Sequence, residues 1–326
     1  MTRSAVPPPV TAVMDAASAW LPERMAEVEE RLADAAVGHG SELGGEAEAT
    51  LAAGGKRLRP LLVLMAAGNS AGEQAVRAAA AVELMHMATL VHDDVLDGAP
   101  VRRGRPTVVA RAGRARAQEV GDLLLSRSFA ELAADGAELQ VAELSSAAIA
   151  LARGELAQRR DTYDTTISEE RYLERCGLKT ARLFEAACRV GRLASGAPGT
   201  EQLAQFGREI GLAFQLLDDV LDVSGPPERT GKARGADLLD GTVTLPLIRA
   251  RQADRSLDEL DLRALDEQAA AEICDRIAAT GALEQVRDEA RARVEAAKQL
   301  VGTAPLEQTQ RELLMLVADG VVERYS

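Results

Sequence analysis

The sequence predicts an all-α protein, and three observations support this. Hydrophobic residues make up 47% of the 326 residues, mainly Ala, Leu and Val, which suffices for a large core. Aromatic residues account for only 2%, whereas sheet cores are richer in aromatic and β-branched side chains. Apolar residues recur at spacings of three and four, and no alternating pattern of useful length occurs. Because no linker separates two halves, we expect a single domain over residues 1–326, with residues 1–10 disordered.

Helix-breaking residues delimit the expected helices in the first part of the chain. The first helix spans about 10–36, and the glycine-rich segment 37–49 interrupts the pattern. The segment GGKRLRP at 54–60 places Pro60 in the first turn of a helix that continues through 61–67. We therefore expect an irregular connection between these two helices.

A long apolar helix is expected from Glu73 to Asp97, because Gly98 and Pro100 follow it directly. The next segment, VRRGRPT at 101–107, is predicted to be a basic loop. Further helices are expected at 117–134, 138–161, 168–176, 179–195, 199–223, 242–253, 267–279, 281–301 and 305–324, with breakers at 196–199 and 224–235.

Charge and cysteine content argue against several classes of function. A net charge of −13 disfavours nucleic acid or an anionic membrane as a general partner. No apolar run reaches the roughly 20 residues that span a bilayer, and the N-terminus lacks the apolar region of a signal peptide. The cysteines Cys176, Cys188 and Cys274 show no CxxC spacing, so we expect small buried hydrophobes. We expect a cytoplasmic protein without stable membrane insertion.

The segment HDDVLD ends the long helix with three acids, Asp93, Asp94 and Asp97. Asp93 and Asp97 lie one turn apart, where two bare carboxylates repel by roughly 3 kcal/mol at an effective dielectric of 20. The negative end of the helix dipole adds to this repulsion. Such a cluster calls for a cation, and all-oxygen ligands favour Mg²⁺ or Mn²⁺. For this motif alone, an acidic, solvated helix end is an equally good interpretation.

A second acidic cluster has the same spacing. In FQLLDDVLD, Asp218, Asp219 and Asp222 again end a long apolar helix before a loop rich in Gly and Pro. Two such helices can face each other in a bundle with both clusters at one end. That arrangement would hold several metal ions, and it suits the capture of a diphosphate whose oxygens complete the metal shells.

Basic residues accompany the acidic motifs in glycine-bearing loops. Arg offers forked contacts to phosphate oxygens, and Lys offers a point charge. The clustered residues are Lys56, Arg57, Arg59, Arg102, Arg103, Arg105, Lys179, Lys232 and Arg234. Ordinary surface charge is the better interpretation for Arg111, Arg114 and Arg116.

Together these segments resemble the polyprenyl synthetase family, the trans-isoprenyl diphosphate synthases. The resemblance is close over about Leu51–Arg249 and looser in the C-terminal helices. The matching segments are GGKRLRP, HDDVLDGAPVRRGRPT, GD at 121–122, GE at 154–155, KT at 179–180, FQLLDDVLD and GKARGADLLDGTVTLPLI. The resemblance implies the isoprenoid synthase fold, an antiparallel helical bundle around a central cavity.

The resemblance also implies roles for individual residues. Asp93, Asp94, Asp97, Asp218, Asp219 and Asp222 resemble the family's ligands of three Mg²⁺ ions on the allylic diphosphate, with Mn²⁺ possible. Arg102, Lys179 and Lys232 resemble direct partners of that diphosphate, and Lys56, Arg59, His86 and Arg103 resemble residues that bind isopentenyl diphosphate. Thr180 and Gln215 resemble groups whose dipoles face the allylic cation. Thr242 departs from the pattern, because the family often has a basic residue there.

The implied reaction joins isopentenyl diphosphate head-to-tail to an allylic diphosphate such as dimethylallyl, geranyl or farnesyl diphosphate. The allylic C–O bond ionises, the isopentenyl double bond attacks the cation, and a proton is lost to the departing diphosphate. No nucleophilic triad is needed. His92 is tempting as a base, but a histidine at a helix end is easily satisfied locally.

Product length is predicted from the helix that carries Asp93, because the growing tail runs back along it. The upstream side chains are Thr89 and Ala88, then Met85, then Val82 or Ala81, and none is aromatic. The family resemblance implies that a bulky aromatic ring on this face would stop growth of the prenyl chain. Because no such ring is present, we expect a product of C30 or longer. A plug from Phe129 or Met87 leaves C15–C20 farnesyl or geranylgeranyl products open.

Two rival functions remain in view. A class I terpene cyclase would share the bundle and the first acidic motif, but it would not need GGKRLRP or a second DDxxD. A catalytically silent partner subunit of a prenyl synthase would be favoured by loss of an acidic motif, and both are intact. The family resemblance and common symmetry predict a homodimer.

Overall fold

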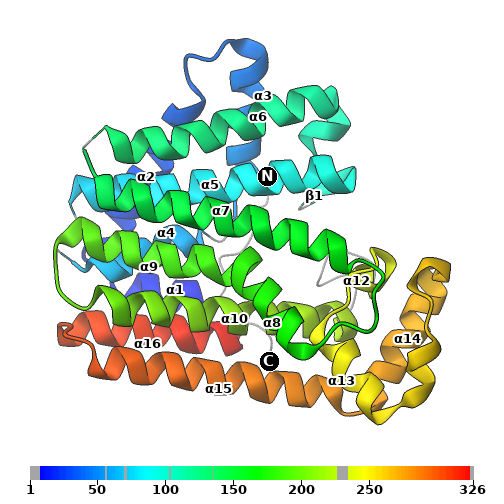
Figure 1. The fold of residues 1–326 in the computed structure, drawn as a ribbon. Helices are drawn as coiled ribbons and strands as arrows, with labels where there is room; N and C mark the ends of the chain where they lie inside the picture. The colour runs from blue at the N-terminus through cyan, green and yellow to red at the C-terminus, as the bar shows by residue number, and fades with distance from the viewer. Residues whose placement is uncertain are drawn as a thin grey trace. The chain divides into compact units, whose positions relative to one another are not determined.

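The part of the chain that the structure describes is mostly helical with almost no strand, which confirms the predicted all-α class (Figure 1). The computed structural model describes residues 8–55, 57–69, 72–102, 104–134, 136–225 and 234–323. In these ranges the only strand pairing is a hairpin of β1 (Val101–Arg102) with β2 (Arg105–Pro106). None of the described helices combines the length and the apolarity needed to cross a membrane. Residues 1–7 of the segment expected to be disordered lie outside the described residues, and the first helix begins at Pro8.

The chain divides into two compact units. The first combines Met1–Ala148, Leu183–Gly207 and Leu300–Val317, and the second combines Ile149–Arg182, Arg208–Gln299 and Ala318–Ser326. Each unit is therefore assembled from three stretches that are distant in the sequence. The single domain expected over 1–326 stays a prediction.

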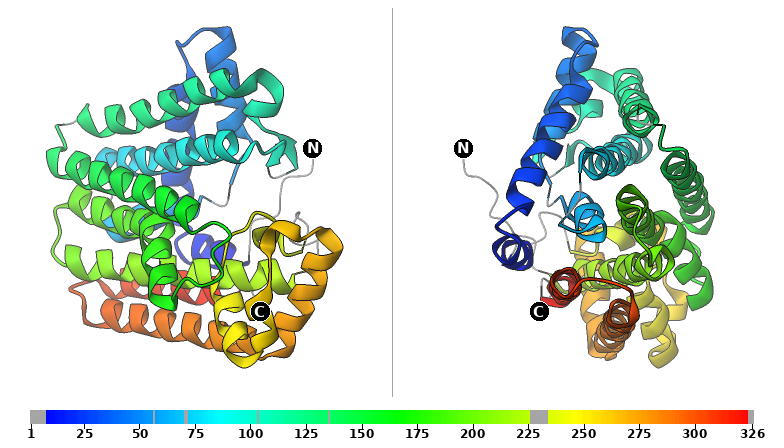
Figure 2. Two further views of the ribbon diagram at one scale, coloured as in Figure 1. Left: turned by 45° about the vertical axis from the view of Figure 1, so that its right-hand side comes forward. Right: turned by 90° about the vertical axis from the view of Figure 1, so that its left-hand side faces the viewer.

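In the first unit, α5 (Glu73–Asp97) packs along α6 (Val108–Ala133) and against α2 (Leu21–Ala36) and α4 (Leu58–Ala67) (Figures 1 and 2). Every residue of α5 from Ala75 to Met85 except Arg77 is buried, because neighbouring helices cover the helix on several sides. Its four consecutive alanines have small side chains that allow close approach. The other helices wholly or partly in this unit are α1 (Pro8–Ala16), α3 (Ser41–Ala52), α7 (Glu138–Asp161), α9 (Arg182–Ser195), α10 (Thr200–Ser224), α15 (Ala282–Thr303) and α16 (Gln308–Glu323).

The second unit contains a helix with a local change of pitch. Helix α8 (Glu169–Cys176) runs into a π-helical turn (Gly177–Ala181), which continues directly into α9. A π turn accommodates one more residue than an α turn and often marks a functional site. The unit also contains α12 (Ala236–Leu239), α13 (Leu245–Ala253), two 3₁₀ turns (Arg255–Glu259 and Leu262–Ala264) and α14 (Glu267–Ala279). Both α12 and α13 pack against α14.

The predicted interruption at 37–49 is wrong over most of its length, because α3 begins at Ser41. Gly38 and Gly40, with φ of 87° and 77°, make the turn that the glycines predicted. Gly44 instead serves packing, because a Cβ there would lie 2.8 Å from the carbonyl oxygen of Ala36 at the end of α2. Tertiary contact therefore outweighs the low helix propensity of glycine.

Among the other helix boundaries that differ from the prediction, two have a clear local cause. The expected helix at 10–36 is broken before Leu21, and Pro22 lies in the first turn of α2, where proline is favoured. Helix α6 starts at Val108 rather than at 117, because the Thr107 hydroxyl caps it by accepting from the Ala110 N–H at 3.1 Å. Gly113, with a φ of 82°, kinks α6 without ending it.

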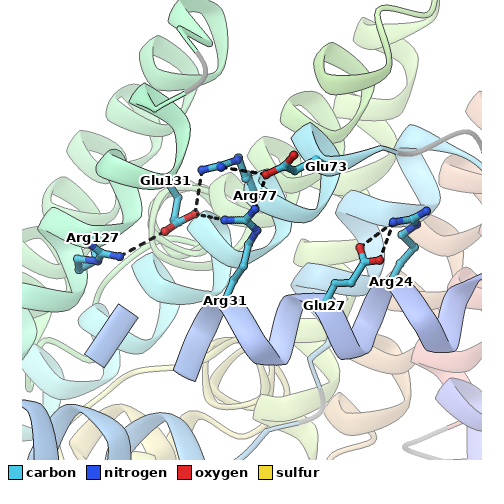
Figure 3. Close-up of polar contacts among 7 residues, drawn as sticks. All are labelled: Arg24, Glu27, Arg31, Glu73, Arg77, Arg127 and Glu131. Atoms are coloured by element: carbon cyan, nitrogen blue, oxygen red, sulfur yellow. Dashed lines mark hydrogen bonds and ion pairs between the residues drawn. The ribbon is translucent and has the colours of Figure 1, made fainter. Parts of the chain in front are cut away.

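An ion-pair cluster joins α2, α5 and α6 at the N-terminal end of α5 (Figure 3). Glu131 near the end of α6 is buried, and its carboxylate lies 3.3 Å from Arg31, 3.7 Å from Arg77 and 3.5 Å from Arg127. Arg31 and Arg77 also pair with Glu73, at 2.6 and 3.0 Å. The cluster therefore fixes the end of α5 that is remote from the aspartate triplet.

The cysteines match the prediction of small buried hydrophobes. All three are buried and free. Burial raises the pKa of the Cys176 thiol to about 12 and that of Cys274 to about 11, so both thiols stay protonated at neutral pH. We assign them no nucleophilic role.

Candidate active site

The first aspartate triplet occupies the last turns of α5. Asp94 is buried, Asp93 is half-buried and Asp97 is exposed. The helix ends at Gly98, whose left-handed φ of 63° turns the chain at once toward β1. This turn brings Arg102 back to the helix, where its Nε donates to Asp94 Oδ1 at 2.7 Å. The middle aspartate is therefore held by an ion pair, and the outer two are more accessible.

The second triplet has the same division at the end of α10. Asp218 is exposed, Asp222 is half-buried, and Asp219 is only 2% exposed. Both oxygens of Asp219 accept hydrogen bonds, from Tyr172 Oη at 2.5 Å and from Gln215 Nε2 at 2.7 Å. Burial raises the pKa of Asp219 to about 7, although these two donors act in the opposite direction.

Asp222 has a local partner as well. Its Oδ2 accepts from the backbone N–H of Asp237 at 3.2 Å, at the start of α12. A carboxylate is favourable there because the first N–H groups of a helix lack partners within the helix. Asp222 thus ties the end of α10 to the segment that follows it.

The donor chemistry of each triplet fits Mg²⁺. Carboxylate oxygens are hard ligands, and Mg²⁺ usually takes one or two of them and fills its other positions with water or substrate phosphate. Within the described ranges, no three or more His, Cys, Asp and Glu side chains form a ready-made metal cage. The accessible first and last aspartates of a triplet, one turn apart, match the smaller number of protein ligands that a shared metal–diphosphate site needs.

The GGKRLRP segment is anchored through Arg57. This residue is buried and adopts a left-handed φ of 46°, which is uncommon outside glycine. Its guanidinium donates to Glu83 Oε1 on α5 at 2.8 Å and to Glu29 Oε1 on α2 at 2.6 Å. A third contact, to the Leu51 carbonyl, is 3.0 Å long. Arg57 therefore fixes the segment in place, and the more accessible Arg59 is its candidate ligand-binding residue.

Arg59 and His86 lie in the same unit as the first triplet. Arg59 is half-buried in the first turn of α4, and its guanidinium carbon lies 4.5 Å from the centroid of the Phe184 ring. Stacking on an aromatic face orients a guanidinium while leaving its edge available to an anion. His86 is half-buried on α5, two turns before Asp93.

The π-helical turn carries two predicted site residues. Lys179 Nζ lies 2.6 Å from Glu155 Oε2 on α7, and the Thr180 hydroxyl lies 2.7 Å from Gln215 Oε1 on α10. Close packing holds the turn, because a Cβ on Gly154 would lie only 2.6 Å from the backbone nitrogen of Lys179. The GE pair at 154–155 therefore combines a required glycine with a partner for the lysine.

The GD pair at 121–122 acts on His92 in a similar way. His92 Nε2 lies 3.1 Å from Asp122 Oδ1, and a Cβ on Gly121 would lie 2.4 Å from the same nitrogen. His92 thus has a partner on α6, 30 residues away in the sequence, rather than at its own helix end.

The structure brings together some of the predicted residues but not all. Thr180, Gln215 and Asp219 form one continuous hydrogen-bonded chain in the second unit. The first triplet belongs to the first unit, so the convergence of the two triplets stays a prediction. Lys56, Arg103 and Lys232 lie outside the described residues.

Sequence reasoning missed three partners of these residues. Tyr172 and Glu83 carry no local motif that identifies them, because their partners are 47 and 26 residues away. Glu155 was part of a matching segment, but its pairing with Lys179 depends on how α7 packs on the π turn.

Replacing Arg57 with Met would leave the Glu83 carboxylate buried without its guanidinium partner. We expect the free energy of unfolding to fall by about 3–5 kcal/mol, as measured by urea denaturation. The double variant Arg57→Met/Glu83→Leu removes both charges and should recover most of the loss. A single variant as stable as the parent would contradict the importance of this ion pair.

Comparisons with known proteins agree with the resemblance of the motifs. A family model described as polyprenyl synthetase matches residues 41–279. The chain is 42% identical over 240 residues to heptaprenyl diphosphate synthase component 2 of Geobacillus stearothermophilus, covering 72% of this chain and 75% of that protein. It is 37% identical over 282 residues to octaprenyl diphosphate synthase of Escherichia coli, covering 83% and 86%.

A solved structure and a further relative extend this picture. The structure of polyprenyl synthase from Caulobacter crescentus, complexed with calcium and isoprenyl diphosphate, matches with a TM-score of 0.89 and 34% identity, covering 99% of this chain and all of that chain. Geranylgeranyl diphosphate synthase of Methanosarcina mazei is 35% identical over 283 residues, covering 83% and 86%. Because the relatives are named for both long and shorter products, identity alone does not fix product length.

Proposed function

The chain belongs to the polyprenyl synthetase family, and on this premise we propose that it condenses isopentenyl diphosphate head-to-tail with an allylic diphosphate, giving a linear all-trans polyprenyl diphosphate of C30 or longer. The named relatives are prenyl diphosphate synthases, and this chain is such a transferase. The observation that carries the proposal is the shared construction of the two triplets. In each, the middle aspartate is buried and hydrogen-bonded, and the outer two are half-buried or exposed.

The outer aspartates are proposed to hold Mg²⁺ on the allylic diphosphate. Bound Mg²⁺, three ions in the family pattern, would neutralise the leaving diphosphate and so favour ionisation of the allylic C–O bond. Arg102, Lys179 and Lys232 are proposed to contribute positive charge to the same group. Arg102 pairs with Asp94 and Lys179 with Glu155, so both cations are held by a carboxylate before the substrate arrives.

Thr180 is proposed to face the allylic cation. Its hydroxyl donates to Gln215 Oε1, so its proton is engaged and its oxygen lone pairs are left to stabilise positive charge. Isopentenyl diphosphate, bound by Lys56, Arg59, His86 and Arg103, then attacks the cation through its double bond. One C–O bond breaks, one C–C bond forms, and the proton lost from the new cation goes to the released diphosphate.

The buried face of α5 supports the proposed product length. Ala81, Val82, Met85 and Ala88 are buried, and Thr89 is half-buried, one turn before Asp93. None carries a ring that would block a growing prenyl tail along this helix. The C15–C20 alternative rests on a block contributed by another residue, such as the half-buried Phe129 on α6 or the buried Met87.

The proposed reaction is tested with the purified chain, labelled isopentenyl diphosphate, farnesyl diphosphate and Mg²⁺. We expect chain extension that EDTA abolishes, and an at least 100-fold lower kcat for Asp93→Asn or Asp218→Asn. Asp288→Asn, which alters an exposed acid on α15, is the matched control. Product only after adding a second protein would favour a silent partner subunit, and cyclic product made without isopentenyl diphosphate would favour a terpene cyclase.

Product length is tested at Thr89, where a larger side chain is tolerated better than at the fully buried positions. We expect Thr89→Phe to shorten the main product to C15–C20, because the ring would fill the path along α5. Thr89→Val keeps the size and loses only the hydroxyl contact to the His86 carbonyl at 2.8 Å, so its products should match the parent's. Chromatography of the dephosphorylated products measures both, and unchanged length in Thr89→Phe would refute this path.

We also propose a homodimer in the cytoplasm. Ile149 and Leu156 are 60% and 56% exposed and lie seven residues apart on the same face of α7, which is an apolar surface suited to a second copy. Light scattering at micromolar concentration should give twice the chain mass, and Ile149→Asp/Leu156→Asp should give the monomer. A monomeric parent would refute the homodimer, and the relative named as component 2 makes a separate partner subunit the alternative.

A further inference from the structure

Asp219 is a buried acceptor that joins two helices. Its carboxylate is 2% exposed, and each oxygen is engaged by a different donor, the Tyr172 hydroxyl from α8 and the Gln215 amide from α10 itself. Gln215 precedes Asp219 by one helical turn, so the two side chains lie on one face of α10. The tyrosine is the contact that comes from outside this helix.

The acceptor at Asp219 fixes the direction of the whole chain of hydrogen bonds. An ionised carboxylate only accepts, and in keeping with this the Gln215 amide presents its NH₂ group to Asp219 and its oxygen toward Thr180. That oxygen then accepts from the Thr180 hydroxyl at 2.7 Å. The proton of Thr180 is thereby directed to Gln215, and its oxygen lone pairs are left for another partner.

The π turn allows Tyr172 and Thr180 to meet the same helix. Eight residues separate them, which in a regular α-helix would leave them about 80° apart around the axis. The π turn, in which Thr180 lies, takes up part of an additional residue and so reduces this angle. Both residues consequently contact α10, Tyr172 at Asp219 and Thr180 at Gln215.

Tyr172 is itself held firmly and shielded. Its side chain is fully buried, so we assign it a role through its neighbours rather than on the substrate itself. The guanidinium carbon of Arg175 lies 5.5 Å from the centroid of its ring, and Arg175 is fixed in turn by a 2.5 Å hydrogen bond to the Val243 carbonyl. These contacts hold the ring of Tyr172, while its hydroxyl is engaged by Asp219.

We propose that Tyr172 is a positioning residue for allylic ionisation, acting through Asp219 and Gln215 to set the orientation of the Thr180 hydroxyl. The inference rests on the proposed function, because it assigns Thr180 to the cation. Without the tyrosine donor, Asp219 keeps only its hydrogen bond from Gln215. The Asp219 carboxylate is then less fixed in position, and so is the Gln215 amide that donates to it. The effect should fall on the ionisation step rather than on binding of isopentenyl diphosphate.

The test is a double-mutant cycle between Tyr172→Phe and Thr180→Val. We expect Tyr172→Phe to lower kcat about 10- to 100-fold, the range typical of residues that orient a primary ligand, with KM for isopentenyl diphosphate within about twofold. If Tyr172 acts through Thr180, the double variant should be no slower than Thr180→Val alone. Multiplying effects would overturn the proposal, because they would mean that the tyrosine acts independently.

Binding and folding measurements separate positioning from general damage. Calorimetry with inorganic pyrophosphate and Mg²⁺ should give the same affinity for Tyr172→Phe as for the parent. The control is Tyr163→Phe, which removes a hydroxyl from a half-buried tyrosine of the same unit and should leave kcat unchanged. Weaker pyrophosphate binding in Tyr172→Phe, or unchanged kcat, would overturn the proposal.

A variant that does not fold and a parent that is inactive each need a separate interpretation. If Tyr172→Phe does not fold, Gln215→Met breaks the same chain one step nearer to Thr180 and should show the same non-additivity with Thr180→Val. A parent that makes no prenyl product overturns both the proposed function and this inference. An active parent with a fully active Tyr172→Phe variant overturns the inference alone.

Discussion

Repulsion between carboxylates at the negative end of a helix is the constraint on which this protein is built. Each aspartate triplet places three acids within two turns, where the helix dipole also opposes them. In both triplets the middle aspartate is buried and accepts hydrogen bonds from specific donors. Asp94 receives the guanidinium of Arg102, and Asp219 receives Tyr172 and Gln215. The outer acids remain accessible, and there a divalent cation would relieve the remaining repulsion.

Close backbone contact at glycine is the second device that shapes the site. The π turn carries Lys179 and Thr180, and it approaches α7 at Gly154 so tightly that a Cβ would collide with the backbone. The same approach brings Glu155 within 2.6 Å of the lysine. A change of helical pitch, a missing side chain and an ion pair therefore operate together at one place. Together they position the Lys179 ammonium group for the proposed phosphate binding and the Thr180 hydroxyl for the proposed stabilisation of the allylic cation.

The sequence was informative where a short motif contains the candidate site residues. The repeated DDxxD spacing, the basic loops and the KT pair singled out the aspartates, Lys179 and Thr180 as candidate site residues without coordinates. It was less informative where the role of a residue depends on packing against segments that are far away in the sequence. The glycine-rich segment 37–49 predicted a break in helix, yet its Gly44 lies inside α3 against the end of α2. Arg57 read as one of several phosphate-binding cations, and the structure pairs it with two carboxylates.

Composition and periodicity by themselves determined the all-α class, the motif spacing determined the two acidic helix ends, and the resemblance of the motifs to known sequences indicated the family. These properties are local, because helix periodicity and i, i+4 spacing are set within a few turns. Only the tertiary structure decided which aspartate of a triplet is buried, which arginine anchors the GGKRLRP segment, and which tyrosine supports Asp219. Those assignments depend on pairs of side chains far apart in the chain, and hydrogen bonds and burial between such pairs exist only once the helices have packed.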